Sequence, residues 1–281
     1  MVLIAAVISV FVFPLTANDV FAGVTLTQDH SARQRLTPFQ LEIEKQRVRL
    51  GSVEIEDRRE ALAHLRSMAH PAASRVALSA LADPAPIVRA TAAAAVLYLP
   101  AEESAASLIP LLSDKEEFVR QQAAYALGQT RSRVAVAGLI ERLADKKDSV
   151  RGAAAVALGE IAVALAAPSL SAVLSGQPVL TSAKKKRKSK RESNPFVLRA
   201  VAHSLGQIGD RASVPVLIVV LQDEKAESDV RREAAFALGV IGDAAALPAL
   251  RDATTASDPY LSAAAQEAIR KISRPPASGS I

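Results

Sequence analysis

Residues 230–250 read VRREAAFALGVIGDAAALPAL, and their apolar spacing predicts two consecutive helices joined by a turn. Val230, Ala234 and Leu238 recur every four residues, which places them on one face of the first helix. The glycines of "LGVIGD" end that helix, and "AALPAL" from Ala245 predicts the second. A single pair of this kind cannot bury both of its apolar faces, so the stretch predicts a repeated unit.

The same pattern recurs along the chain. Copies of the first helix begin at residues 88, 119, 150, 197, 230 and 261, with a weaker copy at residue 57. The step between copies is 31 residues four times, 33 once and 47 once. Because stacked helix pairs share one continuous core, this period predicts an all-α protein, an α-solenoid of about six helix pairs plus a terminal half-repeat.

The residues between the helices carry turn signals. Asp83, Asp114 and Asp145 each lie five residues before the next copy, and we expect each to cap the N-terminus of the following helix. The glycines of "LGQIGD" at residues 205–210 follow a helix and no strand. We therefore interpret them as turn glycines and exclude a phosphate-binding loop.

The pattern D-x-x-x-x-V-R-x-x-A-A-x-A-L-G-x-I-G resembles the HEAT-repeat family, in the short bacterial form also found in phycobilisome lyases. The resemblance covers residues 57 to about 273. It implies an armadillo/HEAT-type superhelix and says little about function, because one fold serves many functions. Val96 and Leu97 depart from the usual Leu-Gly pair, and the last copy lacks a second helix.

The chain begins with a thirteen-residue apolar run, MVLIAAVISVFVF. A membrane span needs about 20 apolar residues, so this run is more typical of a signal peptide. Small residues would allow cleavage before Gly23 or before Asn18. No Lys or Arg precedes the run, which leaves an uncleaved anchor or a buried helix as alternatives. We expect a protein that is exported, periplasmic or secreted, or anchored in a membrane.

Domain boundaries follow from these segments. Thr37 followed by Pro38 predicts the start of a polar capping helix, because proline suits the first helical position. The expected organisation is a signal peptide or anchor at 1–22, a linker and capping helix at 23–51, a solenoid at 52–273 with a basic loop insertion at about 176–195, and a disordered tail at 274–281.

The basic loop explains the net charge of +5. Without its seven cationic residues, the 34 Lys and Arg residues fall to 27, against 29 Asp and Glu. A run of like charge flanked by Gly, Pro and Ser predicts an extended loop. The candidate polyanion-binding residues are Lys184, Lys185, Lys186, Arg187, Lys188, Lys190 and Arg191.

Three functions could explain this loop: a nuclear localisation signal, nucleic-acid binding and contact with anionic lipid. A solvated loop with no ligand is a fourth interpretation. A nuclear localisation signal conflicts with the export segment. Nucleic-acid binding needs a broader basic surface, so it is disfavoured. Anionic lipid headgroups attract a basic residue by about 1 kcal/mol. We interpret the loop as an accessory contact to a polyanion or a membrane surface.

Arginine also recurs at the second position of the copies. A row of arginines could bind an acidic partner, or each could pair with an Asp of a neighbouring turn and stabilise the stacking. We favour the structural interpretation. Leu198 interrupts the row, whose members are Arg58, Arg89, Arg120, Arg151 and Arg231.

Nothing in the sequence indicates catalysis. The absence of cysteine excludes disulfides, thiolate metal sites and cysteine nucleophiles. His30, His64, His70 and His203 stand at no metal-ligand spacing. Deoxyhypusine hydroxylase, a HEAT-like enzyme, holds its metal with His-Glu dipeptides, and this chain has none, so the resemblance implies no metal site. We predict no catalytic residue, no metal and no cofactor.

The predicted function is a non-enzymatic scaffold of the cell envelope that binds a protein partner on the solenoid surface. Two alternatives stay open. One is a lyase-type or hydroxylase-type HEAT protein that acts on a modified protein or a prosthetic group. The other is binding of nucleic acid or anionic lipid through the basic loop.

Overall fold

The structure is a computed structural model that describes residues 36–179 and 194–274. The described residues from Pro38 onward belong to one compact unit. In the described ranges this unit contains fourteen α-helices and no strand, which confirms the predicted all-α fold. No helix in those ranges is both long and apolar enough to span a bilayer.

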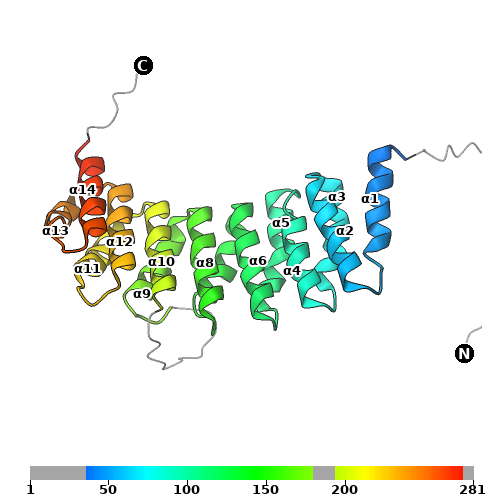
Figure 1. Ribbon diagram of the computed structural model, residues 1–281, viewed down its shortest axis with the longest axis horizontal. Helices are drawn as coiled ribbons and strands as arrows, with labels where there is room; N and C mark the ends of the chain where they lie inside the picture. Colours follow the sequence, from blue (N-terminus) through cyan, green and yellow to red (C-terminus); the bar gives the residue numbers. More distant parts are fainter. Residues whose placement is uncertain (1–35, 180–193, 275–281) are drawn as a thin grey trace, which may run out of the picture. The chain divides into compact units, whose positions relative to one another are not determined.

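Seven helices form a first layer, and each packs against the next one along the chain. Figure 1 shows them side by side in sequence order. They correspond to the seven copies of the repeat. The first-layer helices are α2 (Ile55–Ser67), α4 (Pro86–Ala95), α6 (Glu117–Thr130), α8 (Asp148–Ile161), α10 (Pro195–Ile208), α12 (Ser228–Ile241) and α14 (Pro259–Ser273).

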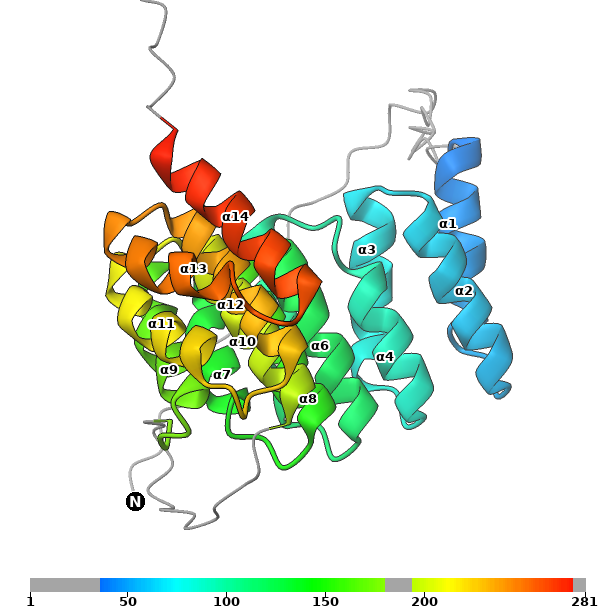
Figure 2. The same ribbon diagram turned by 60° about the vertical axis from the view of Figure 1, so that its left-hand side comes forward.

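The second helices of the pairs form a second layer, seen beside α8, α10 and α12 in Figure 2. Six pairs and the unpaired α14 make the solenoid of six repeats and a half that the period predicted. An additional helix, α1 (Pro38–Arg49), packs against α2 and α3. The second-layer helices are α3 (Pro71–Ala77), α5 (Ala101–Leu108), α7 (Val136–Arg142), α9 (Ala167–Leu174), α11 (Val214–Gln222) and α13 (Leu247–Ala253).

The core consists of small and branched aliphatic side chains. The largest fully buried side chains are all leucines, among them Leu127, Leu158 and Leu238 of the first layer. The apolar positions four residues earlier, such as Ala123 and Ala234, are fully buried as well. Within the described ranges no Phe or Tyr side chain is among the buried residues, although the half-buried ring of Tyr125 packs against them.

The prediction that the repeat glycines form turns is only half right. Gly206 lies inside α10, and a Cβ atom there would be 2.9 Å from the Cα of Ala237 in α12. This glycine therefore allows close approach of two first-layer helices. Gly209, three residues later, is the turn residue, because its φ of 73° is left-handed and favours glycine.

The prediction that the repeat aspartates are N-cap residues is wrong by two positions. The N-cap residues of α4 and α6 are Ala85 and Glu116, and neither caps its helix with its side chain. Asp83 and Asp114 instead accept a hydrogen bond from the amide of the N-cap residue itself, at 2.8 and 2.9 Å. The carboxylates thus stabilise the turn before the helix, and they remain available to a second partner.

Candidate functional site

That second partner is arginine. Arg120 donates two hydrogen bonds to Asp145, from Nε to Oδ2 at 2.9 Å and from Nη2 to Oδ1 at 3.0 Å. Its Nη1 donates to the carbonyls of Asp114 and Lys115 at 2.9 and 3.2 Å. One guanidinium therefore joins the turn before its own helix to the turn before the next first-layer helix.

The same geometry occurs in two earlier repeats. Arg58 makes the paired contacts to Asp83, and Arg89 makes them to Asp114. In all three pairs both side chains are at most 10% exposed. These three arginines are held inside the turns and do not form part of an outward-facing surface.

The other two arginines of the row lack this partner. The residue 25 positions after Arg151 is Gly176, and Arg151 pairs instead with Asp148 of its own helix. Arg231 donates from Nε to the carbonyl of Leu221 at 2.9 Å. The row is thus structural in its first three members and irregular at Arg151 and Arg231.

Two of the paired aspartates, Asp114 and Asp145, have a lowered pKa. Burial alone would raise the pKa of Asp145, but hydrogen bonds from Arg120 and from the amide of Lys147 outweigh it and lower the pKa below its ordinary value. The pKa of Asp114 is lowered by the same balance, with Arg89 and the amide of Glu116 as donors. Both carboxylates are therefore charged at neutral pH, as a bidentate pair requires.

The aromatic side chains gather on a different surface. We define the first-layer face as the unburied residues of α2, α4, α6, α8, α10, α12 and α14. Five of the seven aromatic residues in the described ranges lie on it, and the other two are Phe39 of α1 and Tyr98, which follows α4. The five are Phe118, Tyr125, Phe196, Phe236 and Tyr260.

Several of these rings bridge adjacent helices. Phe196 of α10 lies directly over Gly152 of α8, where any Cβ atom would collide with its ring. The ring of Phe236 in α12 stacks on His203 of α10, with centroids 6.1 Å apart, and has Lys271 of α14 4.8 Å above it. The first-layer face is therefore continuous from α8 to α14.

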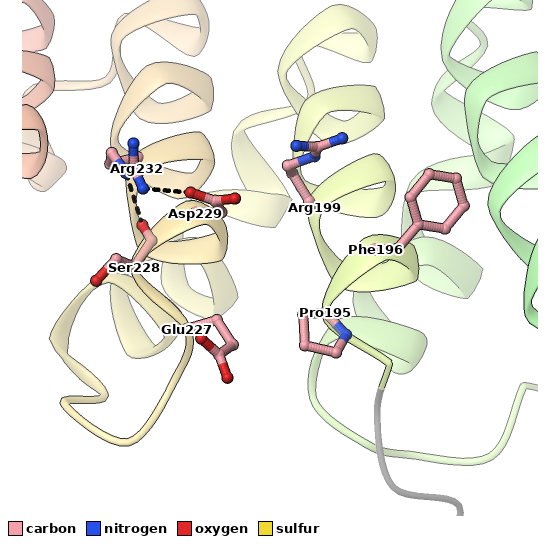
Figure 3. Close-up of a pocket in the computed structure, with 7 residues that line it drawn as sticks. All are labelled: Pro195, Phe196, Arg199, Glu227, Ser228, Asp229 and Arg232. Carbon is pink, nitrogen blue, oxygen red and sulfur yellow. Dashed lines mark hydrogen bonds and ion pairs between the residues drawn. The ribbon is translucent and has the colours of Figure 1, made fainter.

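A small pocket opens on this face between the N-terminal ends of α10 and α12. Figure 3 shows Arg232 bonded to Asp229 and Ser228, and the ring of Phe196 turned away toward α8. The volume is about 390 Å³. The lining residues are Pro195, Phe196, Arg199, Glu227, Ser228, Asp229 and Arg232.

The histidines of the described residues occupy structural or surface positions. His70 caps α3 by accepting from the amide of Ala72 at 3.1 Å, and His203 lies 2.8 Å from Glu233. His64 is exposed on α2, and His30 is outside the described residues. In the described part of the chain no group of three or more His, Asp or Glu residues is placed to hold a metal ion.

The seven cationic residues from Lys184 to Arg191 lie outside the described residues, as does the N-terminal apolar run. The aromatic surface, in contrast, was missed by sequence reasoning. Its signal was present: Phe118, Phe196 and Tyr260 all occupy the position just before the first repeat residue, and Tyr125 and Phe236 both occupy the seventh.

Two layers of helices, stacked pair upon pair, define the protein as an α-solenoid. The model for HEAT repeats matches residues 47–128, 74–159 and 188–273, which together span most of the chain. The chain belongs to the HEAT-repeat family. No curated protein matches the sequence significantly.

Similar solved structures are also repeat proteins. The CpcE–CpcF complex of phycocyanin lyase from Nostoc sp. PCC7120 is 22% identical, with 95% of this chain and 93% of that chain covered and a TM-score of 0.48. YibA of E. coli is 19% identical, with 86% and 99% covered and a TM-score of 0.49. Human deoxyhypusine hydroxylase is 18% identical, with 83% and 96% covered and a TM-score of 0.36. Likeness at this level says nothing about activity.

Proposed function

We propose that the protein is a non-enzymatic scaffold that binds a protein partner on the first-layer face. One observation carries this proposal. In the described part of the chain no aromatic side chain is fully buried, and the first layer exposes four of them, Phe118, Phe196, Phe236 and Tyr260. Aromatic side chains are enriched in protein interfaces and supply much of the binding energy there.

The second layer differs from the first in this respect. Its large exposed apolar residues are aliphatic and isolated, such as Leu165 before α9 and Val219 in α11, which are 76% and 65% exposed. Single exposed aliphatic residues are normal on soluble proteins and need no partner. The contrast supports binding on one layer only.

Site-specific photo-crosslinking in the producing cell tests this proposal. A photoreactive residue at Gln122 or Tyr125, on α6, should yield one discrete protein adduct. The matched positions Leu165 and Val219, on the second layer, should yield none. Adducts that form equally on both layers, or only on the second, would contradict the proposal.

We further propose that the scaffold acts in the cell envelope, on the strength of the apolar run at residues 1–13. Mass spectrometry of the native N-terminus in fractionated cells decides this point. A start at Gly23 or Asn18 in an exported fraction would support export, and an intact Met1 in the membrane fraction would support an anchor. An intact Met1 in the soluble cytosol would exclude both.

A further inference from the structure

One carboxylate on the first-layer face has an oxygen with no partner. Glu160 lies in the last turn of α8, and its Oε2 is buried and accepts no hydrogen bond within the described part of the chain. That oxygen lies over Gly128 of α6, where a Cβ atom would collide with it. The other oxygen, Oε1, is not enclosed in this way.

Glu160 also lacks an ion pair. No Lys, Arg or His of the described residues comes within 4.0 Å of its carboxylate. Burial raises the pKa of Glu160 above its ordinary value, and the guanidinium of Arg131 offsets only part of this effect. A buried polar atom without a partner destabilises the fold, and it does so more when the group is charged.

Stacking of the repeats does not require this charge. The residue at the same repeat position in α10 is Gln207, and its amide oxygen lies over Gly159 just as Glu160 lies over Gly128. The residue at the same position in α6 is Gln129. A neutral side chain of the same length therefore fits the position, so packing between the repeats does not require a carboxylate here.

The surroundings of Glu160 hold one cation, Arg131, which directly follows α6 and makes no ion pair with Glu160. Beyond the first helical turn, the unburied residues of α4, α6 and α8 include no other charged side chain. They are mainly apolar or amide side chains, such as Gln122, Tyr125 and Val156. Glu117 and Asp148, in the first turns of α6 and α8, already have cationic partners in Lys147 and Arg151.

We propose that Glu160 anchors a cationic side chain, Arg or Lys, in the segment of the protein partner that docks on the first-layer face. The inference rests on the proposed function and adds the chemistry of the partner. A cation beside apolar residues complements a carboxylate that Arg131 approaches without forming an ion pair. Gln122 and Gln129 can both donate to and accept from a peptide backbone.

The test uses two synthetic peptides with the same apolar sequence, one with a central arginine and one with the neutral isostere citrulline. Binding to the full-length, isotope-labelled protein is followed by NMR at the amide of Gly128. The arginine peptide should bind at least about tenfold more tightly, a difference of about 1.4 kcal/mol. Glu160→Gln should abolish the preference without loss of helical content, because Gln207 already fits the equivalent position.

The matched control is Glu267→Gln on α14, whose carboxylate already has Arg270 as a partner. This variant should keep the preference for arginine. The proposal is overturned if neither peptide binds, if both bind equally, or if the preference survives Glu160→Gln. First-layer crosslinks without an arginine preference would contradict only the role of Glu160, whereas the absence of those crosslinks would contradict the docking surface itself.

Discussion

Three arginine–aspartate pairs connect successive repeats in the first half of the solenoid. Each guanidinium is satisfied by a carboxylate and by backbone carbonyls, as at Arg89 with Asp114, Asp83 and Pro84. A buried ion pair is costly to desolvate and becomes strongly destabilising when one partner is removed. The pairs therefore define the geometry between turns more than they add net stability.

The lowered pKa of Asp145 predicts a pH dependence. A carboxyl whose pKa is lower in the folded than in the unfolded state stabilises the fold above the unfolded pKa, and this contribution is lost as pH falls through the folded pKa. Asp145→Asn should cost about 3 kcal/mol at pH 7, because Arg120 is left unpaired. Its free energy of unfolding should then fall less steeply than that of the wild type when the pH drops below about 5.

Urea denaturation at a series of pH values checks this prediction. The matched control is Asp223→Asn, because Asp223 holds the same repeat position but has Leu198, not arginine, 25 residues before it. The control should keep the wild-type pH profile. Equal pH profiles for Asp145→Asn and the wild type would show that the pair carries no acid sensitivity.

A second prediction concerns the C-terminus of α8. Ala162 has a φ of 55°, in the region where α10 and α12 use Gly209 and Gly242. A non-glycine residue there costs about 1–2 kcal/mol. Ala162→Gly should therefore raise the free energy of unfolding by about 1 kcal/mol. Ala157→Gly, inside the same helix, should lower it. Thermal denaturation that moves both variants in the same direction would refute the explanation.

At the scale of the helix, close packing depends on small residues at two positions of neighbouring first-layer helices. Ala237 of α12 contacts α10 at Gly206, and Ala268 of α14 contacts α12 at Gly239. The sequence pattern showed that these residues recur. It could not show that a glycine near a helix end faces another backbone, because the partner residue is about 30 positions away.

Gly206→Ala tests this packing. Alanine is about 1 kcal/mol better than glycine inside a helix, yet the added Cβ would meet the backbone of Ala237 at 2.9 Å. We expect a net loss of about 1–3 kcal/mol, because the backbone cannot move aside cheaply. In Gly138→Ala the nearest atom is the end of the Leu112 side chain, which can turn, so that variant should be neutral or stabilised. Chemical denaturation should give opposite or clearly unequal shifts, and equal shifts would contradict the packing argument.

At the scale of the whole molecule, the positive net charge comes from one segment. Replacing the seven cationic residues from Lys184 to Arg191 with glutamine would change the net charge from +5 to −2. Attraction to anionic lipid amounts to about 1 kcal/mol per basic residue and is screened by salt. We expect the wild type to sediment with phosphatidylserine vesicles at low salt, and the variant to remain in solution.

Neutral phosphatidylcholine vesicles are the control for that experiment. Sedimentation of the neutralised variant with anionic vesicles would show that the basic segment is not the lipid contact. Binding of the wild type to neutral vesicles would point to the apolar N-terminal run instead. Neither result would bear on the proposal that a partner binds the first-layer face, because that face and the basic segment consist of different residues.

The sequence by itself determined the period, the helix pairs and the aliphatic core, because burial of Ala234 and Leu238 follows from spacing within one helix. It also indicated that the arginines pair with recurring aspartates. Only the tertiary structure decided that the aspartates sit before the N-cap residue, that Gly206 separates two helices, and that Glu160 lies over Gly128 without a partner. The physical reason is the distance along the sequence between the residues in contact. Periodicity within a helix depends on neighbouring residues. Contacts across the first-layer face instead join residues about 30 positions apart, and their alignment depends on how successive helices stack.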